Sequence, residues 1–95
     1  MPSYELVFIL NANLGEDDLT GLLGKVNDVI TKLGGTVVET NQWGKRKLAY
    51  PIKRQMEGNY VLEKVQIKQT ALKELDHSLK LTNDVLRYLC VRSNS

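Results

Sequence analysis

Hydrophobic and polar positions change their spacing several times along this chain, and each change marks a new structural element. Residues 4–10 form a compact apolar run, too short for a typical helix, which ends at the turn-forming residues 11–15. From Leu19 to Leu33 the apolar residues recur every three or four positions, which predicts an amphipathic helix. The first part of the chain therefore predicts a strand followed by a helix.

The ends of this predicted helix carry their own signals. The acidic residues at 16–18 fall in its first turn, where the positive end of the helix dipole favours negative charge. Gly34 and Gly35 supply the backbone freedom that commonly ends a helix. Gly21 and Gly24 lie inside the helix, where each costs about 1 kcal/mol relative to alanine. We therefore expect a helix with clear ends and weak interior positions.

The middle of the chain predicts one long, bent strand. Residues 36–51 are rich in β-forming residues at both ends, and Gly44 lies between them, where a bulge or bend is expected. Pro51 has no N–H to give to a strand ladder, so this strand either lies on an edge of the sheet or ends at the proline. Both outcomes leave the strand accessible to a partner.

The last part of the chain predicts two more strands and a second helix. A turn is expected at 57–59, and residues 60–67 return as a strand. Thr70 is the expected N-cap of a helix that has leucines on one face and ends near residues 82–83. Residues 85–92 then close the chain as a strand.

This order, β-α-β-β-α-β, predicts a single α+β domain over residues 1–95. Right-handed crossovers give a ferredoxin-like sandwich, which is a four-stranded antiparallel sheet with both helices on one face. The first and third strands are then central, and the second and fourth strands are edges. The other face stays open, and an open face with basic and aromatic residues is a docking surface for RNA or for another protein chain.

Composition limits what this domain can contain. A chain of 95 residues, 42% hydrophobic and 25% charged, forms one globular domain with a thin core, so we expect no large cofactor. No apolar run approaches the roughly 20 residues of a membrane span, and the N-terminus lacks the basic-then-apolar order of a signal peptide. The single cysteine, Cys90, lies in an alternating apolar stretch, so we expect it to be a core residue in a reducing cytoplasm.

The net charge of +2 conceals a local excess of positive charge. Residues 43–54 include five cations and two aromatic residues without one acid, whereas Lys and Arg alternate with Asp and Glu elsewhere. Two interpretations stay open. In one, this strand meets a polyanion; in the other, its cations only deter edge-to-edge aggregation.

Cations that contact the backbone of a nucleic acid position the protein and do not read the base sequence. The candidates for contact with RNA or with a partner protein are Lys45, Arg46, Lys47, Tyr50, Lys53, Arg54, Arg87 and Arg92. Trp43 and Tyr50 either stack on bases or fill the sheet, and beside Pro51 we expect Tyr50 to fill the sheet.

The sequence does not provide the residue sets that catalysis or metal binding requires. One histidine, His77, and one cysteine cannot assemble a structural zinc site, and His77 falls on the polar side of its helix. No nucleophile, base and orienting group converge, and the helix dipole explains the acids at 16–18. We expect no enzymatic activity, no metal and no small-molecule substrate.

Particular residues argue against two activities found on this fold. Small phosphatases that cleave acyl phosphates hold phosphate on the loop after the first strand, but here residues 11–15 contain no cation and three acids follow them. RNA-recognition-motif domains need a basic-Gly-aromatic pattern on the third strand, and residues 58–63 do not match it.

Three blocks of sequence resemble the family of the bacterial small-subunit ribosomal protein six, and together they span nearly the full length. They are Tyr4-Glu5 leading into residues 10–14 (Leu-Asn-Ala-Asn-Leu), residues 44–52 (Gly-Lys-Arg-Lys-Leu-Ala-Tyr-Pro-Ile) and residues 83–88 (Asn-Asp-Val-Leu-Arg-Tyr). The central block is the most specific of the three. Order and spacing follow the family pattern throughout.

The resemblance implies a structural component of the small subunit of the cytoplasmic ribosome. By this resemblance the protein binds the central domain of small-subunit ribosomal RNA as a heterodimer with small-subunit ribosomal protein eighteen. Arg46 and Arg87 fall on basic positions of the family pattern and are the best candidates for contact. Many relatives have a longer, sometimes acidic C-terminal tail, whereas this sequence ends at Ser95, so no contact of such a tail is carried over.

The competing interpretation is a protein-interaction or regulatory domain of the same fold that binds no RNA. Its basic stretch would then only protect an edge strand. Salt distinguishes the two interpretations, because RNA binding weakens steeply with ionic strength and an apolar sheet interface does not.

Overall fold

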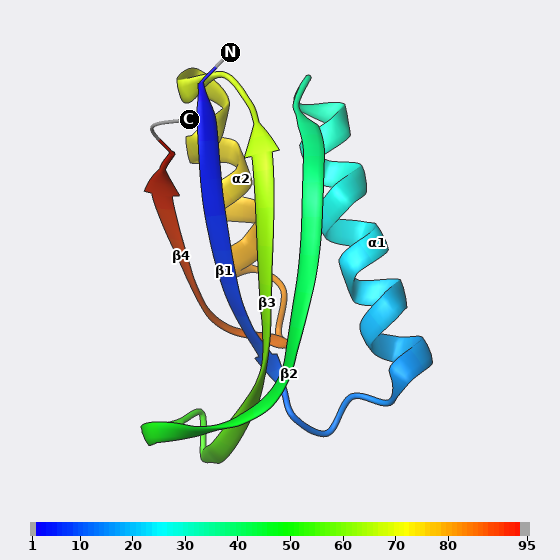
Figure 1. Cartoon of the computed structure of the whole chain (residues 1–95), viewed down its shortest axis with the longest axis vertical. Coiled ribbons are helices and arrows are strands. Elements are labelled where there is room, and N and C mark those ends of the chain that lie inside the picture. Colours follow the sequence, from blue (N-terminus) through cyan, green and yellow to red (C-terminus); the bar gives the residue numbers. More distant parts are fainter. Residues whose placement is uncertain (1, 94–95) are drawn as a thin grey trace.

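The computed structural model describes residues 2–93 and confirms the predicted β-α-β-β-α-β order. Its elements are β1 (Ser3–Asn11), α1 (Glu16–Lys32), β2 (Thr36–Ile52), β3 (Gln55–Gln66), a 3₁₀ turn (Gln69–Ala71), α2 (Leu72–Lys80) and β4 (Val85–Arg92). The strands form one antiparallel sheet in the order β2-β3-β1-β4, so β1 and β3 are central as predicted. Both helices lie on one face (Figure 1). The end of the sequence at Ser95 lies outside the described residues.

The core lies between the helices and one face of the sheet. Residues 4, 6, 8 and 10 of β1 are buried on this side, whereas the residues between them are half-buried on the other side, as the two-residue period of a strand requires. The apolar stripe of α1 and the α2 residues Leu75 and Leu79 pack against the buried positions. The sheet therefore has one covered face and one open face.

Helix α1 begins and ends where the sequence predicts. Glu16 and the two acids after it occupy the first turn. Past the last turn, the Gly34 N–H donates to Thr31 O at 3.0 Å, and the Gly35 N–H donates to Ile30 O at 2.9 Å. Gly34 has a φ of +84°, a left-handed conformation that glycine adopts without steric cost. The glycine pair therefore ends the helix and turns the chain into β2.

Replacing Gly21 and Gly24 by alanine should raise the free energy of unfolding by about 0.5–1 kcal/mol per site, because alanine has the higher helix propensity. A Cβ on either glycine meets nothing within 4 Å. Denaturant unfolding of the single and double variants measures the gain. Gly34→Ala, at positive φ, is the matched control and should lose stability. A loss at Gly21 or Gly24 would contradict the propensity argument.

The second helix differs from its prediction at its beginning. Thr70 lies inside the 3₁₀ turn and not at the N-cap, which is Ala71. The tight turn continues directly into α2, and the Ala71 N–H donates to Lys68 O at 3.0 Å, so backbone bonds take the place of the expected side-chain cap. The helix is only nine residues long. Cys90, expected in the core, is exposed because it borders an open hollow between β4 and α2.

One charged residue is buried between the sheet and α1. Glu63 of β3 has an exposed fraction of 0%. Its carboxylate accepts a hydrogen bond from the Thr40 hydroxyl at 2.8 Å, and the Asn27 amide nitrogen, turned toward it, donates at 2.8 and 3.2 Å. Burial raises the pKa of Glu63 from its ordinary value of 4.5, and the bond from Thr40 opposes this rise with a smaller effect. The hydrogen-bond partners of this buried carboxylate are therefore neutral.

Candidate nucleic-acid and partner interface

The ends of β2 and β3 form a hairpin that extends beyond the helices. Gly44 has a φ of +83° and lies at a shift of register between the two strands, which confirms the bend predicted there. Past this bend the strands curve toward the β4 side of the sheet (Figure 1). The basic stretch thus lies on an edge strand that leaves the body of the domain.

A two-residue turn at Lys53 and Arg54 closes the hairpin. Ile52 pairs with Gln55, and the two residues between them have φ angles of 49° and 67°. The turn predicted at 57–59 is wrong, because those residues continue β3 and pair with neighbouring strands. Asparagine and glycine favour such a left-handed turn, so two cations at these positions carry a conformational cost. The sequence contained no Gly or Asn signal for this turn.

Alternation along β2 places its basic residues on two different sides. Arg46 lies opposite Gly58, which belongs to the side of β3 that faces away from the helices. With Trp43 and Tyr60 it lines a shallow hollow on the open face. The lysines on either side of Arg46 point away from this face. Arg46 is therefore the β2 cation that lies with aromatic side chains.

A polar groove lies on the other side of the hairpin. Lys45 and Arg54 line it together with Asn13 from the loop between β1 and α1, and its volume is about 380 Å³. The Ala12 N–H donates to the side-chain oxygen of Gln55 at 3.1 Å, which ties this loop to the hairpin. The groove is thus formed by segments distant in sequence.

The end of the hairpin contacts the beginning of β4. The Arg87 guanidinium donates a hydrogen bond to the Tyr50 hydroxyl, and the Lys53 ammonium donates to Val85 O at 3.5 Å. These contacts bring cations from two distant parts of the chain to one end of the sheet.

Most of the predicted contact residues therefore gather at this end of the molecule, and all of them are exposed. The gathered residues are Lys45, Arg46, Lys47, Tyr50, Lys53, Arg54 and Arg87. Arg92 lies at the other end of β4, opposite Tyr4, and is not part of the group. Tyr50 is 55% exposed, so the expectation that it fills the sheet is wrong. Its hydroxyl instead accepts a hydrogen bond from Arg87 of β4, past the bend at Gly44.

The open face of the sheet carries an apolar surface that the charge pattern did not reveal. Val7 of β1 lies between Leu62 of β3 and Leu89 of β4. Leu89 and Val91 are 51% and 58% exposed. The signal was present in the unbroken apolar run at 6–10, since a stretch of strand that is apolar at every position offers apolar residues to both faces. Within residues 2–93, no element covers this surface.

The open face joins the hairpin at a closely packed point. A Cβ on Gly58 would lie 2.5 Å from Cγ2 of Ile9, so glycine is the residue that fits there without displacing its neighbour. Next to it, buried Asn59 donates to Asn11 O at 3.0 Å. The base of the hairpin is thus fixed by packing, and with it the position of Arg46.

Cys90 and the single histidine do not form a reactive site. Among residues 2–93 no three His, Cys, Asp or Glu side chains come together in a way that could hold a metal ion. Cys90 is exposed as a residue, but partial burial of its thiol beside the hollow, and to a smaller extent the Asp76 carboxylate, raise the pKa of the thiol, which disfavours the nucleophilic thiolate. His77 is exposed, as predicted.

No helix in the described part of the chain is long and apolar enough to cross a membrane.

Comparison with known proteins gives consistent matches over the whole chain. A family model described as Ribosomal protein S6 matches residues 3–92. The small ribosomal subunit protein bS6 of Caldanaerobacter subterraneus is 38% identical over 94 residues, which are 99% of each chain. That of Thermoanaerobacter pseudethanolicus is 39% identical, also over 99% of each chain. The crystal structure of 30S ribosomal protein S6 from Thermotoga maritima superposes with a TM-score of 0.90 at 28% identity, covering 97% of this chain and 87% of that one.

Proposed function

The chain belongs to the ribosomal protein S6 family, and we propose that it binds the central domain of small-subunit ribosomal RNA together with small-subunit ribosomal protein eighteen. The family is a structural and not an enzymatic component of the small subunit, and its place is the cytoplasmic ribosome. In this proposal the hairpin and the open face serve one assembly function: together they hold an RNA junction in its folded arrangement.

The observation that carries this proposal is the position of the basic hairpin beside the open apolar face. Trp43, Arg46 and Tyr60 lie where the two regions meet. Tryptophan, tyrosine and arginine are the residues that most often dominate the energy of a protein interface. A partner docked on the open face would therefore lie next to the cations of the hairpin, and both proteins would present one continuous surface to RNA.

A shared surface also fits the modest charge of the chain. With a net charge of +2, the protein alone should bind RNA weakly, because affinity for a polyanion rises with the number of phosphates that cations neutralise. A docked partner adds phosphate contacts without further ordering of this chain, which raises the joint affinity.

The direct test is binding to a central-domain RNA fragment over a series of salt concentrations, with and without protein eighteen. We expect tight, salt-sensitive binding when both proteins are present and weak binding by either protein alone. If the folded protein binds no RNA in either condition, the proposal fails. The same protein would then be a protein-interaction domain, for which the apolar open face is the supporting observation.

A second test removes the two cations of the turn without damaging the turn. The double substitution Lys53→Asn with Arg54→Gly introduces the residue pair that such a left-handed turn favours, so stability should be kept or raised. The slope of log affinity against log salt for the joint complex should become shallower by about 1.8, which is about 0.9 for each lost phosphate contact.

The control for the turn variant is Lys25→Gln with Lys73→Gln, since both lysines are exposed on the helices, away from the hairpin. It removes the same charge from the other side of the sheet and should leave the slope unchanged. Equal slopes for the turn variant, the control and the unmodified protein would show that the two cations of the turn do not contact RNA.

A further inference from the structure

The outer edge of β4 is unprotected, in contrast to the opposite edge of the sheet. On β2, three shifts of register, Pro51 and the exposed lysines interrupt the edge. β4 contains no proline and no lysine, and its pairing with β1 shifts only once, near its beginning between Ile9 and Leu10. Long, regular edge strands of this kind are templates for the addition of another strand.

The register shows which backbone groups this edge offers. The Ser93 N–H donates to Ser3 O at 2.8 Å, and hydrogen-bonded pairs alternate along antiparallel strands. Residues 87, 89 and 91 therefore direct their N–H and C=O groups toward β1. Tyr88, Cys90 and Arg92 direct theirs outward.

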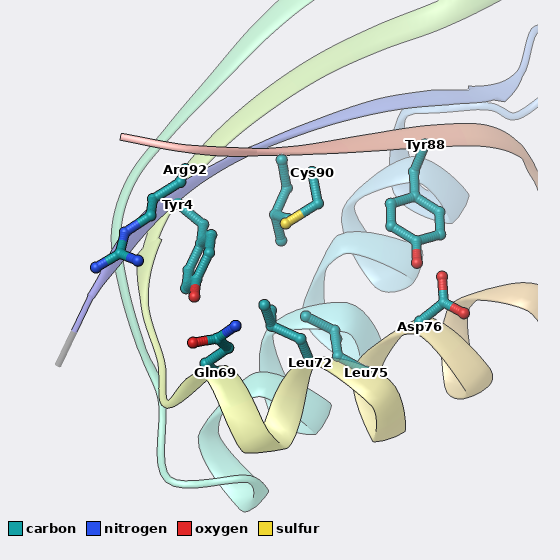
Figure 2. Close-up of a pocket in the computed structure, with 9 residues that line it drawn as sticks. Tyr4, Gln69, Leu72, Leu75, Asp76, Tyr88, Cys90 and Arg92 are labelled. Atoms are coloured by element: carbon teal, nitrogen blue, oxygen red, sulfur yellow. The ribbon is translucent and has the colours of Figure 1, made fainter. Parts of the chain in front are cut away.

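The same three residues line a hollow between β4 and α2. In Figure 2 the side chains of Tyr88 and Cys90 project toward the helix, and Leu72 and Leu75 project toward the strand. The hollow measures about 460 Å³, and Arg92 lies at one end of it. A side chain of an added strand that points to this side of the sheet would enter it.

The charges along this edge define what kind of segment fits. Arg87 and Arg92 are the only charged residues of β4. The nearby Asp76 carboxylate is paired with Lys80 at 3.0 Å, so it does not neutralise the arginines. A second copy of this chain, paired edge to edge, would bring two further arginines and no acid. The complementary strand is therefore acidic and belongs to a different protein.

We propose that the outer edge of β4 is a docking site for an extended, acidic segment of another protein, which joins the sheet as a fifth strand. One apolar side chain of this segment fills the hollow beside Cys90. A carboxylate two positions away, on the same side of the strand, meets Arg92. This site shares only Arg87 with the cations gathered at the hairpin end, and its hollow and Arg92 lie away from them. Its occupation does not depend on RNA binding.

The probe is a peptide with blocked ends and the symmetric sequence Thr-Thr-Glu-Val-Leu-Val-Glu-Thr-Thr, which presents leucine and both glutamates on one side in either direction. Amide hydrogen exchange is followed by NMR at about 1 mM peptide, where binding of about −4 kcal/mol half-saturates the site. We expect new protection at the amides of Tyr88, Cys90 and Arg92. Those of residues 87, 89 and 91 are protected already. This alternation distinguishes strand addition from simple filling of the hollow.

The matched variant exchanges the charges. Arg92→Glu should weaken binding of the acidic peptide about fivefold. The same variant should bind a control peptide, in which lysine replaces both glutamates, more tightly than the unmodified protein does. The substitution is on an exposed side chain, so folding is kept and is checked by the unchanged exchange of the β1 amides.

Three results would overturn the proposal. The first is the absence of new amide protection at this concentration. The second is a set of chemical-shift changes confined to side chains of the hollow without protection of the outward amides, which would indicate a pocket and not a strand site. The third is the same protection without peptide at high protein concentration, which would identify a second copy of this chain as the occupant.

Discussion

Reversing Arg46 and Arg87 to glutamate should lower the affinity of the joint complex for central-domain RNA by roughly 100-fold, or about 1.4 kcal/mol for each reversed charge. Arg46 lies with Trp43 and Tyr60 at the border of the open face, and Arg87 contacts Tyr50 at the beginning of β4. Each reversal removes one cation and adds one repulsive charge on the proposed RNA side. Filter binding or fluorescence anisotropy, with protein eighteen present, measures the loss.

Stability should hardly change in this double variant, because both arginines are exposed and surface substitutions usually shift the free energy of unfolding by less than about 0.5 kcal/mol. The control is Lys25→Glu with Lys73→Glu, which changes the net charge equally on the helix side of the sheet. If this control weakens RNA binding as much as the double reversal, only total charge matters, and the hairpin has no special role. Unfolding of the double variant would show that the arginines are structural.

The fold was predictable because each element carried a strong local signal. The apolar run of β1, the periodic stripe of α1 and the acidic and glycine residues at its ends all point to one solution, and the topology follows from the order of elements. The errors fall where local signals are weak. The 3₁₀ turn before α2 uses backbone bonds in place of the Thr70 cap, and the turn at 53–54 uses cations where Asn and Gly are favoured.

The candidate interface was only partly predictable. A sequence shows which residues are charged, but it does not show which side of a strand each side chain faces. The sequence identified the basic stretch, but it did not reveal that Arg46 and Lys45 face opposite sides or that Tyr50 reaches Arg87. Such relations depend on bulges that change the register of β2. The exposure of Cys90 depends in turn on the hollow between β4 and α2, and local periodicity along β4 carries no information about how closely a neighbouring helix packs.

The two edges of the sheet differ in a way that bears on assembly. β2 carries the features that prevent pairing with another strand, namely bulges, a proline and cations, and it projects as a hairpin. β4 lacks most of them and retains a regular outward ladder. The proposed RNA contact thus uses one edge of the sheet, and the proposed strand addition uses the other.

The stability of the domain should fall as pH rises above 4.5, by up to about 1.4 kcal/mol per pH unit, because of Glu63. A carboxyl with a raised pKa in the folded state binds its proton more tightly than in the unfolded chain. The stability that protonated Glu63 contributes is fully present below its unfolded pKa and is lost as pH rises through its folded pKa. Urea unfolding at a series of pH values from 4 to about 8 measures this loss.

Glu63→Gln identifies the source of the pH dependence, because glutamine keeps the shape of the side chain and cannot ionise. Its amide nitrogen and oxygen can still bond with Thr40 and Asn27, which hold the carboxylate in the folded protein. The free energy of unfolding of this variant should not decline between pH 4.5 and the folded pKa of Glu63. The variant should therefore become more stable relative to the unmodified protein as pH rises. Glu39→Gln, at a half-exposed salt bridge with Lys64, is the control and should retain the decline. An identical pH profile for Glu63→Gln and the unmodified protein would mean that Glu63 is ionised in the fold at the same pH as in the unfolded chain, and that Asn27 and Thr40 together offset the whole cost of its burial.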